Sequence, residues 1–173
     1  ALGADATFVA RCVPVDAKHM QEMLRRAAEH EGTAFIEIYQ NCNIFNDGAF
    51  VHVDDRKERP KNELRLEHGK PLIFGVNKEK GIAIDAGMNP IVVDVETYGE
   101  ENLLVHDEGN RAMSFFLSSL VHPDFPTPTG VFRCVERAPY DELLVAQVEE
   151  AKTKRPGLRV QDAIEDAHIW EVE

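Results

Sequence analysis

Cys42 is the side chain whose type and sequence position best suit chemistry. Three polar side chains stand close to it in the sequence, namely Asn41, Asn46 and Asp47. A thiolate can attack a substrate when a base lies nearby, or it can bind a metal ion. The nearest histidines are His30 and His52, and neither spacing is diagnostic of a catalytic pair. A small hydrolase that uses Cys42, or a His/Asp pair, is therefore only a secondary hypothesis.

An iron–sulfur centre would need more thiolates than this chain can offer. A [4Fe–4S] cluster takes about four cysteines, and the sequence has Cys12, Cys42 and Cys134, with no CxxC pair. A complete cluster site is therefore absent from this chain. The cysteines are odd in number and widely spaced, unlike those of a disulfide framework. This pattern favours a protein of the reducing cytoplasm.

Two groups of histidine and acidic residues could ligate zinc or iron. They are His106-Asp107-Glu108 and His122-x-Asp124. The sequence has neither an HExxH motif nor a paired Cys/His knuckle. We favour structural roles, with His106 ending an apolar strand and His122 at the C-terminus of a helix, where positive charge is favourable.

The residues before Cys42 predict a strand, a helix and a second strand. Residues 6–10 and 34–39 are short apolar runs, and Asp16 is a good N-cap for a helix that continues to about residue 30. Apolar side chains fall on one face of that helix: Met20, Met23, Leu24 and Ala27. This order is typical of a βαβ unit with parallel strands, which binds ligands at the C-terminal ends of its strands. Cys42 follows the second strand directly.

The rest of the chain predicts a mixture of short strands and helices. Residues 51–62 are charged, contain Pro60 and indicate an exposed loop or linker. Strands are predicted at 63–67, 72–76, 81–85, 91–96, 103–106 and 130–136. Helices are predicted at 110–121 and 140–154, and the tail 158–173 is amphipathic and expected to dock on something. The fold class is α/β, a parallel unit followed by a mixed α+β region.

Composition excludes several classes of partner. The chain has 173 residues, 43% of them hydrophobic, and a net charge of −12. The acidic balance argues against binding to nucleic acid or to an anionic membrane, because both need excess Lys and Arg. No apolar run of about 18 residues predicts a membrane span.

Several stretches, in the same order, resemble one known family. They are residues 1–11 (ALGADATFVAR), 30–47 (H-x-G-x-A-F-x-E-x-x-Q-x-C-x-x-F-N-D), 68–75 (HGKPLIFG), 130–133 (GVFR) and 139–141 (PYD). Together they resemble the C-terminal half of the β subunit of 2-oxoacid:ferredoxin oxidoreductases. The sequence around Cys42 resembles the 2-oxoglutarate type more than the pyruvate type. The resemblance implies that residues 1–50 end a thiamine-diphosphate-binding domain and that residues 51–173 form the subunit's C-terminal extension.

The resemblance also implies cofactors and partners. The complete enzyme would use thiamine diphosphate, Mg²⁺ and a [4Fe–4S] cluster to convert a 2-oxoacid and CoA to acyl-CoA while reducing ferredoxin. Cys42 would be the last cluster ligand, and this chain would hold no catalytic residue. The other ligands and the diphosphate-binding motif would lie in the missing N-terminal half of the β subunit, which would assemble with an α subunit. This chain alone would be inactive.

One residue departs from the family pattern. The residue after the ligand cysteine is usually proline, and here it is Asn43. Proline lacks a backbone N–H, so Asn43 restores a donor that could bond a cluster sulfur. The alternative is that the ligand role has been lost. A non-catalytic α/β interaction module therefore stays open as the second hypothesis.

Overall fold

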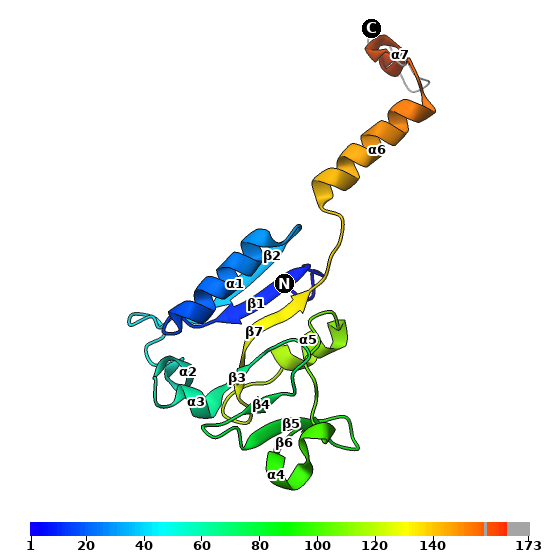
Figure 1. Cartoon of the computed structure of the whole chain (residues 1–173). Helices are drawn as coiled ribbons and strands as arrows, with labels where there is room; N and C mark the ends of the chain where they lie inside the picture. The colour runs from blue at the N-terminus through cyan, green and yellow to red at the C-terminus, as the bar shows by residue number, and fades with distance from the viewer. Residues whose placement is uncertain (158, 166–173) are drawn as a thin grey trace. The chain divides into compact units, whose positions relative to one another are not determined.

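The computed structural model describes residues 1–157 and 159–165. The chain starts with a βαβ unit made of β1 (Phe8–Cys12), α1 (Ala17–Glu29) and β2 (Ala34–Ile38). β1 and β2 pair in parallel, as predicted (Figure 1). Asp16 begins α1 as its N-cap, because its carboxylate accepts the backbone N–H of His19 at 3.2 Å.

One mixed sheet holds the βαβ unit and two later strands. Its order is β2-β1-β7-β3, in which β7 (Thr127–Cys134) runs antiparallel to β1 and parallel to β3 (Glu63–Arg65). The strand predicted at 130–136 therefore starts earlier, because Pro128 fits an extended strand and loses only one hydrogen-bond donor. At Gly130 a Cβ would lie 2.8 Å from the Leu66 carbonyl oxygen, and φ is +118°, so glycine alone fits this close approach.

A second, antiparallel sheet follows β3. It contains β4 (Ile73–Phe74), β5 (Lys80–Ile84) and β6 (Pro90–Asp94). Short helical segments then lead back to β7: α4 (Val95–Tyr98), η1 (Glu100–Asn102) and α5 (Arg111–Ser118). The strand predicted at 103–106 is wrong, since this segment makes only one isolated bridge, between Val105 and Pro71.

The loop predicted at 51–62 is also wrong. The segment forms two single-turn helices, α2 (Val51–Asp54) and α3 (Arg59–Asn62). Asp55 accepts the backbone N–H groups of Lys57 and Glu58 at 2.7 and 3.1 Å and so shapes the turn between them. Pro60 stands in the first turn of α3, where a missing N–H costs nothing.

Apolar side chains pack on both faces of the mixed sheet. Phe8, Ala10 and Cys12 point from β1 toward α1 and pack with Met23, because alternate strand residues face the same side. Val9 faces the other side. The cluster there joins the sheet to α5 and to the second sheet: Leu64, Leu66, Leu72, Phe74, Ile82, Leu117, Leu120 and Phe132.

The chain divides into two compact units, Ala1–Arg137 and Ala138–Glu173. The second unit contains α6 (Tyr140–Lys154), whose predicted bounds were right, and α7 (Val160–Ile164). The predicted docking of the tail falls largely outside the described residues, which omit 158 and 166–173. The predicted division between residues 1–50 and 51–173 concerns the parts of a larger subunit and stays a prediction.

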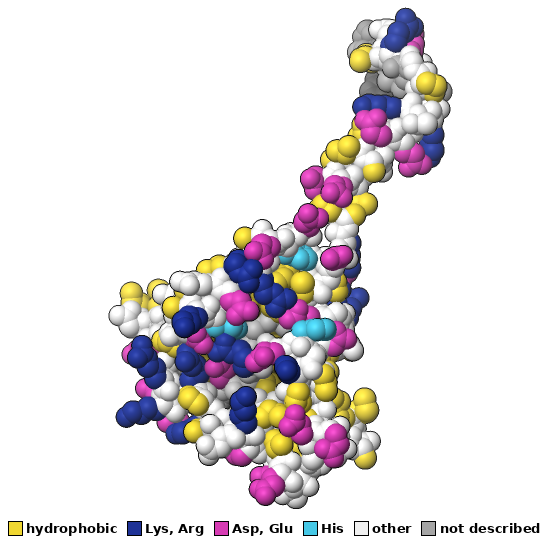
Figure 2. Space-filling model, in the orientation of Figure 1, with side chains coloured by type: hydrophobic (Ala, Val, Ile, Leu, Met, Phe, Trp, Pro, Cys, Tyr) yellow, Lys and Arg dark blue, Asp and Glu magenta, His cyan; other side chains and the backbone are white. Residues whose placement is uncertain are grey.

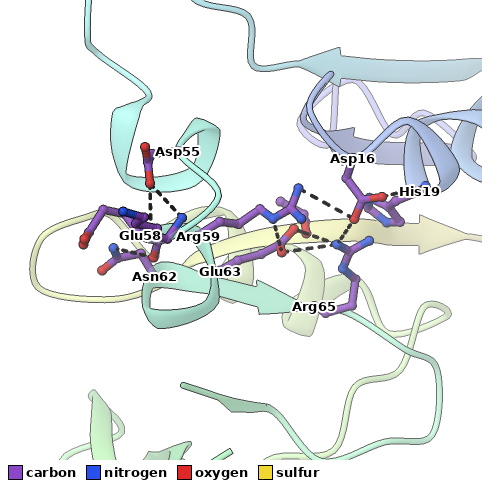
Figure 3. Close-up of polar contacts among 10 residues, drawn as sticks. Asp16, His19, Asp55, Glu58, Arg59, Asn62, Glu63 and Arg65 are labelled. Carbon is purple, nitrogen blue, oxygen red and sulfur yellow. Dashed lines mark hydrogen bonds and ion pairs between the residues drawn. The ribbon is translucent and has the colours of Figure 1, made fainter. Parts of the chain in front are cut away.

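A network of charged side chains ties the start of α1 to β3 and α3. Figure 3 shows Asp16 and Arg65 pointing toward each other, and Asp16 Oδ2 lies 2.7 Å from a terminal nitrogen of Arg65. Glu63 pairs with Arg65 at 3.0 Å and accepts a hydrogen bond from Thr129 on β7 at 2.6 Å. Arg59 lies 3.7 Å from Glu63 and 3.9 Å from Asp16. Figure 2 shows basic side chains gathered on the face that carries these elements.

Replacing Asp16 by alanine should destabilise the fold by about 1 to 2 kcal/mol, because it removes an N-cap and a partly buried ion pair together. Urea unfolding measures the loss. Asp94→Ala is the matched control, since Asp94 caps α4 by accepting the Thr97 N–H at 3.0 Å and has no arginine partner among the described residues. Equal losses in both variants would show that the pairing with Arg65 contributes nothing.

The same variant should change how stability depends on pH. Burial raises the pKa of Asp16, but hydrogen bonds from Arg65 and from the His19 N–H lower it by more, so the folded pKa lies below the ordinary value. The stabilisation of the fold by ionised Asp16 is therefore fully present above the unfolded pKa of about 3.9. It is lost as the pH falls through the folded pKa. The stability difference between parent and Asp16→Ala should shrink on acidification below about pH 4.

Candidate functional site

The loop that carries Cys42 begins where β2 ends and is closed at its base. The rings of Tyr39 and Phe50 stack there with centroids 4.4 Å apart. Inside the loop, the Asn41 side chain donates to Asp47 at 3.0 Å and accepts the Gly48 N–H at 2.9 Å. Asn41 and Asp47, which stood out in the sequence beside Cys42, therefore build the loop.

Backbone N–H groups converge on the Cys42 sulfur. Those of Phe45 and Ile44 lower the pKa of the thiol most, burial raises it slightly, and the N–H of Asn46 lowers it further. The net pKa lies below the ordinary cysteine value. The loop also folds back on Cys42 through its carbonyl, which accepts the Asn46 N–H at 2.9 Å. This geometry stabilises a thiolate, the form that binds metals and attacks electrophiles.

The two histidines nearest to Cys42 in the sequence, His30 and His52, do not activate its thiol. His30 bonds to Thr7 Oγ1 at 2.8 Å, and His52 bonds to Thr127 Oγ1 at 3.0 Å. His52 also stacks on His122, with ring centroids 4.1 Å apart. The two histidines considered as bases are thus engaged elsewhere, and the arrangement does not support a Cys/His catalytic pair.

The other two cysteines lie away from Cys42. Cys12 is fully buried under α1, and burial raises the pKa of its thiol. Cys134 lies opposite Phe8, at the N-terminal end of β1, whereas Cys42 follows the C-terminal end of the parallel strand β2. Among residues 1–157 and 159–165, no three His, Cys, Asp or Glu side chains gather where they could hold a metal ion. Within the described residues, Cys42 therefore stands apart from the other two cysteines.

The histidine groups named in the sequence have structural contacts. His106 is buried and its Nε2 lies 2.7 Å from the Val131 carbonyl oxygen. Glu108 forms a two-pronged ion pair with Arg26, at 3.0 and 2.6 Å, which joins α1 to the segment before α5. His122 has its ring against His52. These contacts are structural, but neither histidine has the position predicted from the sequence, because 103–106 is not a strand and α5 ends at Ser118, before His122.

The surroundings of Cys42 are open and apolar. Ile44 is 78% exposed and Phe45 is 90% exposed. β2 is the edge strand of its sheet, and its Phe35 and Ile38 are also exposed. An apolar parallel edge strand is a surface that proteins normally cover. The position of Cys42 was predictable, but the converging N–H groups and the two exposed side chains had no signal in the sequence.

No described helix is long and apolar enough to cross a membrane.

Comparison with known proteins gives one consistent result, although no family model matches. The chain is 35% identical, over its whole length, to the 2-oxoglutarate oxidoreductase subunit KorB of Mycobacterium tuberculosis, and spans about half (47%) of that subunit. It is 40% identical over 47 residues to the β subunit of a 2-oxoacid:ferredoxin oxidoreductase from Saccharolobus solfataricus, which is 27% of this chain and 15% of that subunit.

A solved structure shares the fold. The 2-oxoglutarate:ferredoxin oxidoreductase from Magnetococcus marinus aligns with 97% of this chain and 43% of its own, with a TM-score of 0.57 and 19% identity. This likeness confirms the α/β fold class, and the sequence relatives confirm the resemblance seen in the motifs. The chain belongs to the family of 2-oxoacid:ferredoxin oxidoreductase β subunits and spans about half the length of its mycobacterial relative.

Proposed function

We propose that this chain is part of a CoA-dependent 2-oxoacid:ferredoxin oxidoreductase acting on 2-oxoglutarate, in which Cys42 binds a [4Fe–4S] cluster. The observation that carries the proposal is the set of backbone N–H groups that converge on the Cys42 sulfur, in an open loop at the end of a parallel strand. Donors of this kind stabilise the thiolate and tune the potential of a bound cluster.

The residues present fit one corner of such a cluster and leave the rest to other segments. When bound, the cluster supplies one-electron transfer, and thiamine diphosphate with Mg²⁺ supplies stabilisation of carbanion character on the substrate. In this chain, the backbone N–H groups of the loop favour the thiolate form of Cys42 by lowering the pKa of its thiol. No glycine-rich diphosphate-binding motif occurs in the sequence, so the groups that bind thiamine diphosphate would lie outside it.

The exposed edge supports a missing partner segment. β2 is the edge strand where another strand can add, its Phe35 and Ile38 side chains are exposed, and Phe45 is exposed on the loop that follows it. Since the chain spans about half of its mycobacterial relative, we propose that the N-terminal half of the β subunit covers this edge and brings the other cluster ligands. The proposal also includes assembly with an α subunit, CoA as a substrate, ferredoxin as the electron acceptor and a cytoplasmic location.

The edge also separates this proposal from a non-catalytic module. A self-contained interaction module would be expected to have a polar edge, whereas β2 exposes large apolar side chains. The cysteine hydrolase hypothesis loses support for a different reason, because His30 and His52 make their hydrogen bonds to threonine hydroxyls.

The assembled enzyme, with the upstream half and the α subunit supplied, tests the ligand role. Cys42→Ala should lower the rate of 2-oxoglutarate-dependent ferredoxin reduction by more than about 100-fold. Loss of a residue that only supports a metal ligand lowers activity by about 10- to 100-fold, and loss of the ligand itself should cost more. Cys134→Ala is the control and should keep the parent rate, since Cys134 lies at the other end of the sheet. An active Cys42→Ala enzyme would contradict the ligand role.

The thiol of Cys42 should also ionise early. In a Cys134→Ala background, the rate of iodoacetamide alkylation against pH should show a midpoint below the ordinary cysteine pKa. The buried Cys12 should react only after unfolding, which makes it an internal control. Mass spectrometry identifies the alkylated residue. A midpoint at or above the ordinary value would show that the backbone donors do not act on the sulfur.

A further inference from the structure

Three arginines surround a single carboxylate at the start of the chain, and we call this group the Asp5 cluster. Arg137 and Arg133 donate to Asp5 at 2.7 and 3.1 Å, from the segment after β7 and from β7 itself. The Nε of Arg111, the first residue of α5, lies 3.9 Å from the same carboxylate. All four residues lie within the first compact unit.

The Asp5 cluster has more positive charge than the carboxylate can neutralise. Three guanidinium groups against one carboxylate leave a local excess of two positive charges, in a chain whose net charge is −12. The side chains of Arg111 and Arg137 are 59% and 50% exposed, so a ligand can reach them.

Unused donors remain in the Asp5 cluster. Each guanidinium has five N–H donors, and within the described part of the chain Asp5 accepts one hydrogen bond from Arg133 and one from Arg137. Arg111 is beyond hydrogen-bond distance of Asp5. Arg133 is 94% buried, since only 6% of its surface is exposed, and its Nε has no partner among the described residues. A buried donor without an acceptor is unfavourable until an acceptor arrives.

The backbone at Asp5 is held in an uncommon conformation. Its φ is +62°, in the left-handed region that side chains other than Gly, Asn and Asp seldom adopt. The Asp5 N–H donates to the Leu2 carbonyl at 3.0 Å, which fixes this turn. The arginines, with the hydrogen bond from Arg137 foremost, hold the pKa of Asp5 below its usual range, so the carboxylate stays charged.

We propose that the Asp5 cluster is a binding site for an oxyanion, the phosphate or carboxylate group of a small molecule, and that the Asp5 carboxylate competes for the same donors. The planar fork of arginine matches both groups with paired hydrogen bonds. Arg111 opens α5, whose first N–H groups carry partial positive charge and favour an anion. This proposal rests on the Asp5 cluster alone and does not depend on Cys42.

The test uses two variants with opposite expected signs. On the complete subunit that contains this chain, calorimetric titration with inorganic phosphate at low ionic strength should show about tenfold weaker binding for Arg137→Gln, which loses a charged donor. Asp5→Asn should bind phosphate about tenfold more tightly, because the internal competitor is gone. Low ionic strength is needed because salt screens exposed charges.

Controls separate binding from folding. Arg25→Gln on α1 removes an exposed arginine that pairs with Glu29 at 2.9 Å and should leave the affinity unchanged. If Asp5→Asn does not fold, Asp5→Gly replaces it, since glycine accepts the positive φ. Titration with succinate in parallel tells a carboxylate ligand from a phosphate ligand, and binding of either supports the site. Absence of binding to Asp5→Asn by both anions, or affinities unaltered by both cluster variants, would overturn the proposal.

Discussion

The ion pair between Asp16 and Arg65 joins the βαβ unit that precedes the Cys42 loop to the strand at the far edge of the mixed sheet. Asp16 begins α1 and therefore fixes where the chain leaves β1 and how it returns into β2. Arg65 connects this point to β3, which pairs with β7, which in turn pairs with β1. The start of α1 is thus held to β3 by a contact between segments far apart in the sequence (Figure 3).

The local parts of this structure could be predicted, and the reason is physical. The N-cap at Asp16 and the one-sided apolar pattern of α1 involve neighbouring residues, as does the start of α6 after Pro139. The errors arose where one residue type suits two structures. Pro60 suits a loop as well as the first turn of a helix, where it lies, and Pro128 suits the segment before a strand as well as the strand that contains it.

The features of the candidate site also divide into those that local sequence predicts and those that only the folded chain reveals. That Cys42 would follow a parallel strand was predictable, because strand order follows from the βαβ pattern. The convergence of N–H groups on its sulfur depends on the backbone angles of a loop, which the residue types do not specify. The Asp5 cluster was out of reach for another reason, since Asp5 is more than a hundred residues from the three arginines and meets them only after β7 pairs with β1.

Whole-chain charge also proved a poor guide to local surfaces. A net charge of −12 describes the average, yet basic side chains gather on the face carrying α1, α2 and α3 (Figure 2) and again around Asp5. Likewise, the overall hydrophobic content of the chain does not reveal that the edge strand β2 exposes apolar side chains. Together these surfaces are consistent with the proposal that other segments of the enzyme pack against this chain, which spans about half the length of its mycobacterial relative.

The most direct measurement is the iron and acid-labile sulfide content, with the EPR spectrum after dithionite, of the anaerobically assembled complex. It should be made on the parent and on Cys42→Ala, with the upstream half and the α subunit present in both. If Cys42 is a ligand, the substitution removes or converts one [4Fe–4S] cluster, and both the iron content and the spectrum change. An unchanged cluster would contradict the account, leave Cys42 with a structural role and give the difference at Asn43 a functional meaning.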